Sequence, residues 1–279
     1  MYTIRCLVDD HTLDPAAFQA EHGVAFAIET PAGHVLFDTG QSGDVLVQNA
    51  DRMGYNLRQI DALVLSHSHY DHTGGLKALM ASSMPGLRLH AHPELFRRRF
   101  SQRDGEMRSI GMNSTQLDLA HHFALHLSTE PVEVLPHAWT TGEIMPRTEF
   151  EGRSPHHYIQ GEHNLQTDPY LDDLSLVLEG RSGSIVVCGC CHAGLLNTIA
   201  RVRSIFDRNI TAIIGGAHLA SVDANTLQHA IEGIRTTCSG LIPDFFLNHC
   251  TGERPIATLT QAFGEKVHPC PAGTVLLFD

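Results

Sequence analysis

Residues 61–75 read DALVLSHSHYDHTGG and form the most informative stretch of the sequence. The apolar run 61–65 predicts a short strand that is buried on both faces. Four side chains that commonly bind metals follow within six residues: His67, His69, Asp71 and His72. His67 and His69 are two residues apart in extended chain, so they point the same way and can bind one ion. Asp71 and His72 lie beyond the bend and can face a second ion.

Further candidates follow other predicted strands. They are Asp38 in LFDTG (36–40), Cys190 and His192 in CGCCHAG (188–194), His218 in GGAHL (215–219) and His249 in NHCTG (248–252). Imidazole and carboxylate ligands suit Zn²⁺, Mn²⁺ or Fe²⁺. The alternative is a solvated polar loop with chance histidines, since the chain has 20 of them.

The pattern His-x-His-x-Asp-His at 67–72 resembles the signature of the metallo-β-lactamase superfamily, and LFDTG resembles its first motif. The resemblance implies an α/β protein with the αββα sandwich of that family. It also implies roles for the candidates. Asp38 would orient a metal-binding histidine, His192 would be the third ligand beside His67 and His69, and His249 would join Asp71 and His72 at the second ion. Asp71 and His218 are the candidate catalytic groups, with ligand or substrate-contact roles also open for His218.

The sequence departs from the family pattern at one place. Gly189-Cys190 occupies the position where many members carry Gly-Asp, whose carboxylate bridges two metals. Cys190 is the candidate for that position, and Asp172 and Asp173 are the nearest acids. Two other interpretations of the cysteines remain open: a redox pair with the C-x-x-C spacing of Cys188 and Cys191, or small core residues.

Several motifs together resemble one subfamily, the metal-dependent hydrolases related to the archaeal dihydropterin ribofuranosylaminobenzene phosphate synthase. They are HSHxDHTGGL, GCxHAG, GGxHL, HCTG and the segment TGEIMPR at 141–147. The resemblance implies two divalent ions, with Zn²⁺ expected and Mn²⁺, Fe²⁺ or Mg²⁺ as alternatives. It implies hydrolysis of a phosphorylated or ester-like small molecule by a metal-bound hydroxide. A dihydropterin-linked transferase and a non-catalytic metal-dependent ligand-binding protein are the alternatives.

Composition excludes several other classes of protein. The chain has 279 residues, 42% hydrophobic and 18% charged, and a net charge of −12, which disfavours nucleic acid as a partner. Seven cysteines, an odd number with three in one tetrapeptide, suit a reducing compartment. The first residues do not resemble a signal peptide, and no apolar run reaches the ~18 residues of a membrane span. We therefore expect a cytoplasmic protein, with homo-oligomers open.

Periodicity predicts strands alternating with helices, which is typical of an α/β layer architecture. Predicted helices cover 44–53, 76–81, 93–100, 194–206, 223–237 and 253–263. Residues 101–165 are rich in Gly, Pro and His, with only brief apolar stretches. We expect a single domain over 1–279 with 101–165 as an excursion and a candidate lid, to which His156, His157 and His163 would contribute.

Overall fold

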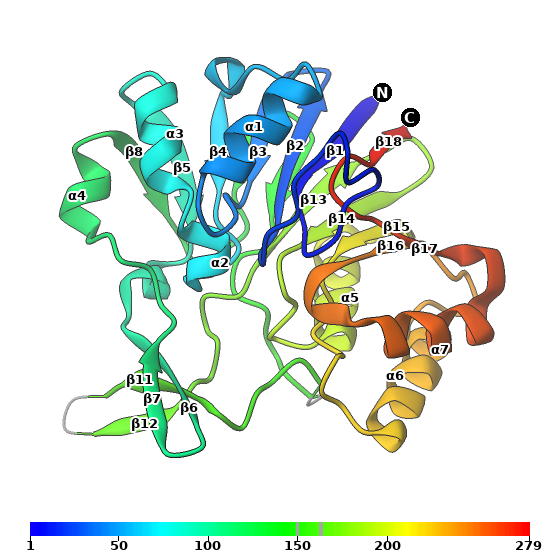
Figure 1. Ribbon diagram of the computed structural model, residues 1–279. Helices are drawn as coiled ribbons and strands as arrows, with labels where there is room; N and C mark the ends of the chain where they lie inside the picture. The colour runs from blue at the N-terminus through cyan, green and yellow to red at the C-terminus, as the bar shows by residue number, and fades with distance from the viewer. Residues whose placement is uncertain (149–150, 162–163) are drawn as a thin grey trace.

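The computed structural model describes residues 1–148, 151–161 and 164–279. Two seven-stranded mixed sheets pack face to face, and helices cover the outer face of each (Figure 1). The first sheet has the order β18 (Val275–Phe278), β1 (Tyr2–Val8), β2 (Ala25–Thr30), β3 (Gly33–Phe37), β4 (Ala62–Val64), β5 (Leu87–Ala91) and β8 (Phe123–Leu127). The second has the order β17 (Val267–Pro269), β16 (Asp244–Leu247), β15 (Ile210–Gly215), β14 (Ser184–Cys188), β13 (Ser175–Glu179), β10 (Ala138–Thr140) and β9 (Glu133–Leu135). This arrangement confirms the predicted αββα sandwich.

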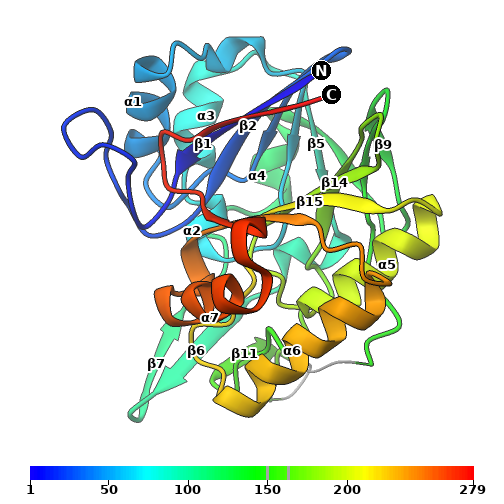
Figure 2. The ribbon, with the colours of Figure 1, turned by 90° about the vertical axis from the view of Figure 1, so that its right-hand side faces the viewer.

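The helices divide between the two outer faces (Figures 1 and 2). Those associated with the first sheet are α1 (Asp44–Arg52), α2 (Tyr70–Thr73), α3 (Leu76–Ser82) and α4 (Gln116–Ala120). The second sheet is covered by α5 (Leu195–Phe206), α6 (Ala224–Thr237) and α7 (Glu253–Phe263). Single 3₁₀ turns are η1 (Leu57–Gln59), η2 (Pro93–Phe96), η3 (His249–Thr251) and η4 (Gly264–Lys266). No helix among the described residues is long and apolar enough to cross a membrane.

Strands that are apolar on both faces follow from this layering. In β3, Val35 and Phe37 belong to the core between the sheets, whereas Leu36 belongs to the core under the helices of the first sheet. All three side chains are fully buried. Because successive residues of a strand point to opposite faces, a strand between two apolar layers needs a continuous apolar run. This explains why the runs at 61–65 and 184–188 lack the usual alternation.

The topology gathers the ends of several strands at one edge. β3, β4 and β5 pair in parallel, as do β14, β15, β16 and β17. Parallel strands finish at the same edge of their sheet, so the loops that follow them are neighbours. The candidate motifs after β3, β4, β14, β15 and β16 are therefore brought together although they are far apart in the chain.

Two sequence-based expectations need correction. Residues 101–165 are not one separate excursion, because β8, β9 and β10 are strands of the two main sheets. The remainder helps to build a third sheet of order β12 (Leu165–Thr167), β11 (His157–Gln160), β6 (Arg99–Arg103) and β7 (Glu106–Ser109). The helix predicted over 93–100 ends as the 3₁₀ turn at Phe96, and β6 begins at Arg99, where pairing with β11 replaces helical hydrogen bonds. His163 lies outside the described residues.

Candidate metal centre and its cavity

Three histidines from two segments form a buried triad. His67 and His69 follow β4, and His192 follows β14; one ring nitrogen of each lies within 4.8 Å of those of the other two. All three residues are buried, at 1–5% exposure. Their Nε2 atoms have no hydrogen-bond partner within the described parts of the chain. Buried polar atoms without a partner are rare and costly, so three that converge form a site suited to a cation.

A second triad, of Asp71, His72 and His249, lies beside the first and is also buried. Asp71 Oδ2 is 3.5 Å from His72 Nε2 and 3.3 Å from His249 Nε2. The rings of His67 and His72 have centroids 4.1 Å apart, which makes the two triads neighbours. The structure therefore brings together all six residues that the sequence suggested as metal ligands, in the two groups that were expected.

Hydrogen bonds from Nδ1 orient four of the five imidazole rings in the two triads. His72 Nδ1 lies 2.7 Å from Asp38 Oδ2, and His249 Nδ1 lies 2.7 Å from Asp10 Oδ1. His192 Nδ1 lies 3.0 Å from the carbonyl oxygen of Gly152. These oxygens accept hydrogen bonds, so each Nδ1 carries a proton and Nε2 is the ring nitrogen left to face a cation. That is the tautomer that binds a metal through Nε2.

Asp38 also orients His67 through Ser66. The Ser66 hydroxyl donates to Asp38 Oδ2 at 2.6 Å, and the Ser66 backbone N–H donates to Oδ1 at 2.7 Å. Since the hydroxyl hydrogen is used in this way, the contact of 2.9 Å between Ser66 Oγ and His67 Nδ1 makes Nδ1 the donor. One carboxylate thus sets the ring orientation of a histidine in each triad, which extends the predicted role of Asp38.

Cys190 lies where the two triads meet. Its Sγ is 3.2 Å from His72 Nε2, and it groups with His67 and His72 within metal-binding reach. A Cβ on the preceding Gly189 would lie 2.1 Å from Ser66 Oγ, so this approach requires glycine. Asp172 and Asp173 are engaged elsewhere: Asp172 with Arg99 and Ser68, and Asp173 with the backbone N–H of Ala193.

The other cysteines are divided between the core and a contact with Cys190. Cys188 is fully buried in the core under α5 and α6, together with Cys191. Cys250, after His249, groups with Cys190 and His249 within metal-binding reach. All seven cysteines are free thiols. The core interpretation of Cys188 therefore fits its position.

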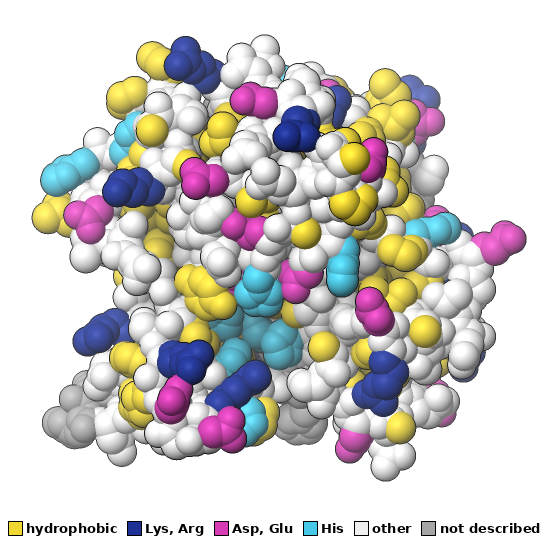
Figure 3. All heavy atoms as spheres, in the orientation of Figure 1, with side chains coloured by type: hydrophobic (Ala, Val, Ile, Leu, Met, Phe, Trp, Pro, Cys, Tyr) yellow, Lys and Arg dark blue, Asp and Glu magenta, His cyan; other side chains and the backbone are white. Residues whose placement is uncertain are grey.

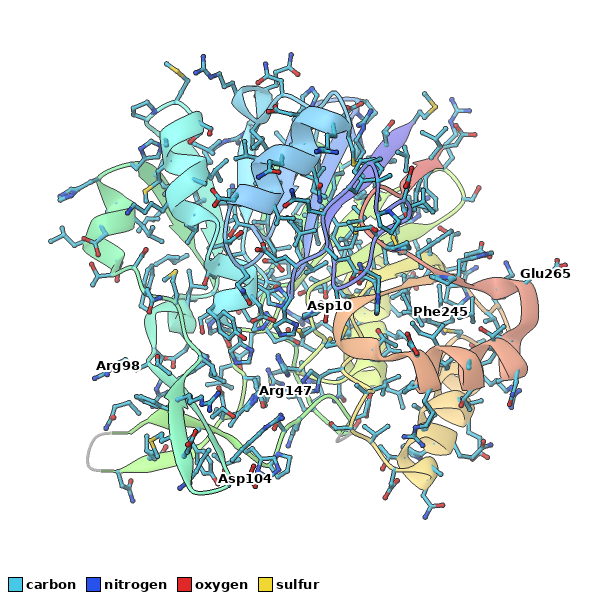
Figure 4. All side chains as sticks on the ribbon, in the orientation of Figure 1. Asp10, Arg98, Asp104, Arg147, Phe245 and Glu265 are labelled. Atoms are coloured by element: carbon cyan, nitrogen blue, oxygen red, sulfur yellow. The ribbon has the colours of Figure 1, made fainter. Side chains whose placement is uncertain are left out.

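A cavity of about 700 Å³ opens onto the triads. Histidine side chains gather in the hollow at the centre of the face seen in Figure 3, with arginine and acidic side chains around its lower rim. The lining includes His69, Asp71, Cys190, His192 and His249 from the site, and His22, His157 and His218 beside them. The hairpin of β6 and β7 contributes Ser101, Arg103, Asp104, Glu106 and Arg108. In Figure 4, Asp10 lies near the centre of the molecule, and Asp104 lies at the far end of this hairpin.

Comparisons with known proteins agree with this geometry. The sequence model of the metallo-beta-lactamase superfamily matches residues 19–180, more than half of the chain. The chain belongs to the metallo-β-lactamase superfamily. It is 27% identical, over 99% of its length and 96% of the relative's, to a Methanocaldococcus jannaschii protein named 7,8-dihydropterin-6-methyl-4-(beta-D-ribofuranosyl)-aminobenzene-5'-phosphate synthase.

Solved structures show the same superfamily fold. Tm1679, described as a metal-dependent hydrolase of the β-lactamase superfamily, superposes with a TM-score of 0.84 and 24% identity, with complete coverage of both chains. The metallo-β-lactamase fold protein YhfI from Bacillus subtilis superposes with a TM-score of 0.60 and 14% identity, covering 99% of this chain and all of YhfI. The metallo-β-lactamase fold supports binding of divalent metal by the clustered His, Asp and Cys side chains.

The protonation states in this metallo-β-lactamase fold suit metal binding. Burial, together with neighbouring imidazoles, holds the pKa of His67 and of His192 well below the usual range. Burial acts in the same way on His69, against the opposing effect of Asp71. Burial alone would raise the pKa of Asp71, but His72 and His249 outweigh it and keep the pKa low. Neutral imidazoles in the first triad and an ionised carboxylate in the second are the forms that bind a cation. Burial alone would lower the pKa of His249, but Cys250, Asp10 and Asp71 outweigh it and raise this pKa well above the usual range, so a cation at the second triad would displace a proton from His249.

Strained backbone conformations also cluster at the site. Asp38, Cys191, His218 and His249 have φ values of 58°, 55°, 47° and 47°. Non-glycine residues rarely adopt the left-handed region, and such residues gather at functional sites because the surrounding structure holds them there. His218 is bent towards the cavity in this way, with its ring centroid 4.3 Å from that of His192.

Several residues of the site were missed by sequence reasoning. Asp9 and Asp10 follow directly after β1 and therefore share the strand-end position that identified the other candidates. Asp9 Oδ1 accepts from the backbone N–H of His249 at 2.8 Å, and burial raises the pKa of Asp9 to about 6. His22 Nε2 is 3.5 Å from Asp71 Oδ2. Nothing in the spacing around His22 indicates this position.

Proposed function

We propose that this protein is a hydrolase that holds two divalent cations, Zn²⁺ being the expected ion, and cleaves a phosphorylated or ester-like small molecule. One triad, His67, His69 and His192, would hold the first cation. The other, Asp71, His72 and His249, would hold the second, with Cys190 between them. One observation supports this proposal most strongly: four imidazole rings share the same orientation. Each donates a hydrogen bond from Nδ1 to an oxygen outside the triads, which leaves Nε2 facing the site; the four are His67, His72, His192 and His249.

When bound, the two cations would supply an activated water at neutral pH and positive charge for the oxygens of the substrate. The residues of the chain provide the rest. Asp38 and Asp10 keep the ligand rings oriented, so little reorganisation is needed during the reaction. Asp71 would act as both a ligand and a proton acceptor. His218, whose pKa burial lowers to about 4, would be neutral and would contact the substrate through a hydrogen bond without protonating a leaving group.

The preference for phosphorylated substrates is supported by the cavity wall. Arg103 and Arg108 line it on the β6–β7 hairpin, where Arg108 pairs with Glu106 at 2.7 Å. Guanidinium groups bind phosphate oxygens in a bidentate way. A cavity of about 700 Å³ is of the size that accommodates a small molecule.

The test is to replace His67 and His69 by alanine, separately, in protein purified with its metal. Each variant should lose most of the metal of the first triad, measured by plasma emission spectroscopy, and should lose hydrolysis of bis(p-nitrophenyl) phosphate. His121→Ala is the matched control, because His121 is exposed at the end of α4 and far from the triads in the fold. Normal metal content in His67→Ala and His69→Ala would refute the assignment.

A carbon–nitrogen bond-forming transfer onto a dihydropterin is a second candidate, favoured by the name of the Methanocaldococcus jannaschii relative. Binding of a reduced pterin, followed by its fluorescence, would support this candidate. Hydrolysis of phosphoesters without any pterin binding would support the hydrolase. Saturable binding of a ligand with no turnover under any divalent metal would instead indicate a non-catalytic binding protein.

A further inference from the structure

His157 reaches the metal centre from the third sheet and has no role in either triad. It begins β11, opposite Ser101 of β6, and both residues line the cavity. Its ring lies perpendicular to that of His69, with the two ring centroids 5.3 Å apart. The centroid of the His157 ring is 6.1 Å from that of the His192 ring. His157 is thus the part of the third sheet that stands beside the first triad.

The ring of His157 is held by Tyr170. Tyr170 is 1% exposed, and its ring stacks on His192 with the centroids 4.3 Å apart and the planes 5° from parallel. The Tyr170 Oη lies 2.9 Å from His157 Nδ1 and 3.2 Å from the backbone nitrogen of Ser154. Tyr170 has φ 50°, so the backbone is strained at the residue that makes this contact.

The direction of these hydrogen bonds determines the tautomer of His157. The Ser154 backbone N–H can only donate, so the Tyr170 oxygen accepts from it. Among the described residues, His157 Nδ1 is then the acceptor within hydrogen-bonding distance of the Tyr170 hydroxyl. A buried hydroxyl hydrogen that has no acceptor is energetically costly. Nδ1 of His157 therefore accepts, and the ring proton lies on Nε2. This is the opposite of the metal-binding orientation of His67, His72, His192 and His249.

We propose that His157 is a catalytic residue that donates its Nε2–H to a phosphoryl oxygen of the substrate beside the first triad, with Ser154 and Tyr170 fixing the donating tautomer. This inference rests on the proposed function for its acceptor, a phosphoryl oxygen. A hydrogen-bond donor that already points at the oxygen on which negative charge develops lowers the activation barrier, because the active site does not have to reorganise during the reaction. The third sheet would then complete the active site.

The tautomer can be measured without any turnover. In zinc-loaded protein with ¹⁵N-labelled histidine, long-range ¹H–¹⁵N spectra should show the Nε2–H form for His157, its signals being assigned by their absence in His157→Gln. Tyr170→Phe keeps the ring that stacks on His192 but removes the hydroxyl, so the Nε2–H preference of His157 should be reduced. An Nδ1–H tautomer of His157 in the parent protein would overturn the proposal.

Kinetics test the catalytic role. With bis(p-nitrophenyl) phosphate as the probe, His157→Phe should lower kcat about 10²-fold with unchanged zinc content, as expected for loss of one oriented donor. His157→Gln, which keeps an N–H donor, should recover part of that loss. His156→Phe is the matched control, since His156 is exposed and adjacent in sequence.

The outcomes separate this inference from the proposed function. An unchanged kcat in His157→Phe, with the parent protein active, would refute the role of His157 alone. No hydrolysis by the zinc-loaded parent protein would refute the proposed function, and with it the phosphoryl acceptor, whatever tautomer the spectra show.

Discussion

Replacing Arg99 by methionine should destabilise the protein more than any other loss of one arginine on the third sheet. Arg99 is 1% exposed, and its guanidinium donates to Asp168 Oδ2 at 2.9 Å and to Asp172 Oδ1 at 2.6 Å. It also donates at 2.6 Å to the Oγ of Ser68, the residue between His67 and His69 in the sequence. Asp172 in turn accepts from the Ser68 backbone N–H at 2.9 Å. Arg99→Met removes the cation that forms an ion pair with each of these two carboxylates.

The expected loss is ~3–5 kcal/mol of unfolding free energy near neutral pH, the usual cost of removing one partner from a buried ion pair. The pH dependence has a definite sign. Burial already raises the pKa of Asp168 and of Asp172, against the opposing effect of Arg99, and loss of Arg99 raises both further. The folded variant then binds more protons than the unfolded chain, so its stability falls as pH rises from ~4 through the raised pKa values. The loss of unfolding free energy in Arg99→Met, relative to the parent protein, should therefore be smallest near pH 4–5.

Urea unfolding followed by circular dichroism at pH 5 and pH 7.5 measures both effects. Arg108→Met is the matched control, because Arg108 is 77% exposed in its pair with Glu106 and should contribute little. Adding Asp168→Asn to Arg99→Met should restore part of the stability, since it removes one of the two unpaired charges. A loss below ~1 kcal/mol, or a loss that does not grow with pH, would refute the reasoning.

Three other substitutions test the site and its surroundings. Asp38→Asn keeps only one of the two oxygens that accept from Ser66 and His72 and removes the negative charge, so it should weaken zinc binding ~10–100-fold in a chelator competition; unchanged affinity would contradict the role of Asp38. Gly189→Ala would put a Cβ 2.1 Å from Ser66 Oγ and should cost ~1–3 kcal/mol, seen as a lower Tm; an unchanged Tm would argue against the close approach. Burial raises the pKa of Asp173 to about 7, so this carboxyl contributes stability that is lost as pH rises from ~4 to 7. Asp173→Asn should remove that contribution, so the variant should lose less stability than the parent protein over this range; parallel stability profiles of the two would count against this buried charge.

The positions of the candidate metal ligands could be predicted because these residues follow apolar strands. Parallel strands bring their ends to one edge, so His192 and His249 lie beside the 67–72 loop although more than 100 residues separate them from it. Strands β13, β14, β15 and β16 of the second sheet and helices α5, α6 and α7 were also predictable from their regular alternation, whereas β9 and β10 were not. Asp10 carries the same strand-end signal after β1, and attention to every acidic residue at such a position would have found it.

The third sheet could not be predicted, because its stabilising contacts join distant parts of the chain. Arg99 pairs with Asp168 across 69 positions, and neither residue has a neighbour in the sequence that indicates the other. Tyr170 and His157 belong to short segments without periodicity, and their roles depend on which ring faces which oxygen. Local patterns identify elements, but such pairings are decided by tertiary packing.

The proposed function requires that two adjacent triads of this chain hold two cations. The most direct measurement is an anomalous diffraction map from a crystal of the protein loaded with zinc, recorded on both sides of the zinc absorption edge. We expect two peaks, one among His67, His69 and His192 and the other among Asp71, His72 and His249. A map from fully loaded crystals with no peak at either triad, or with zinc bound only elsewhere, would contradict it.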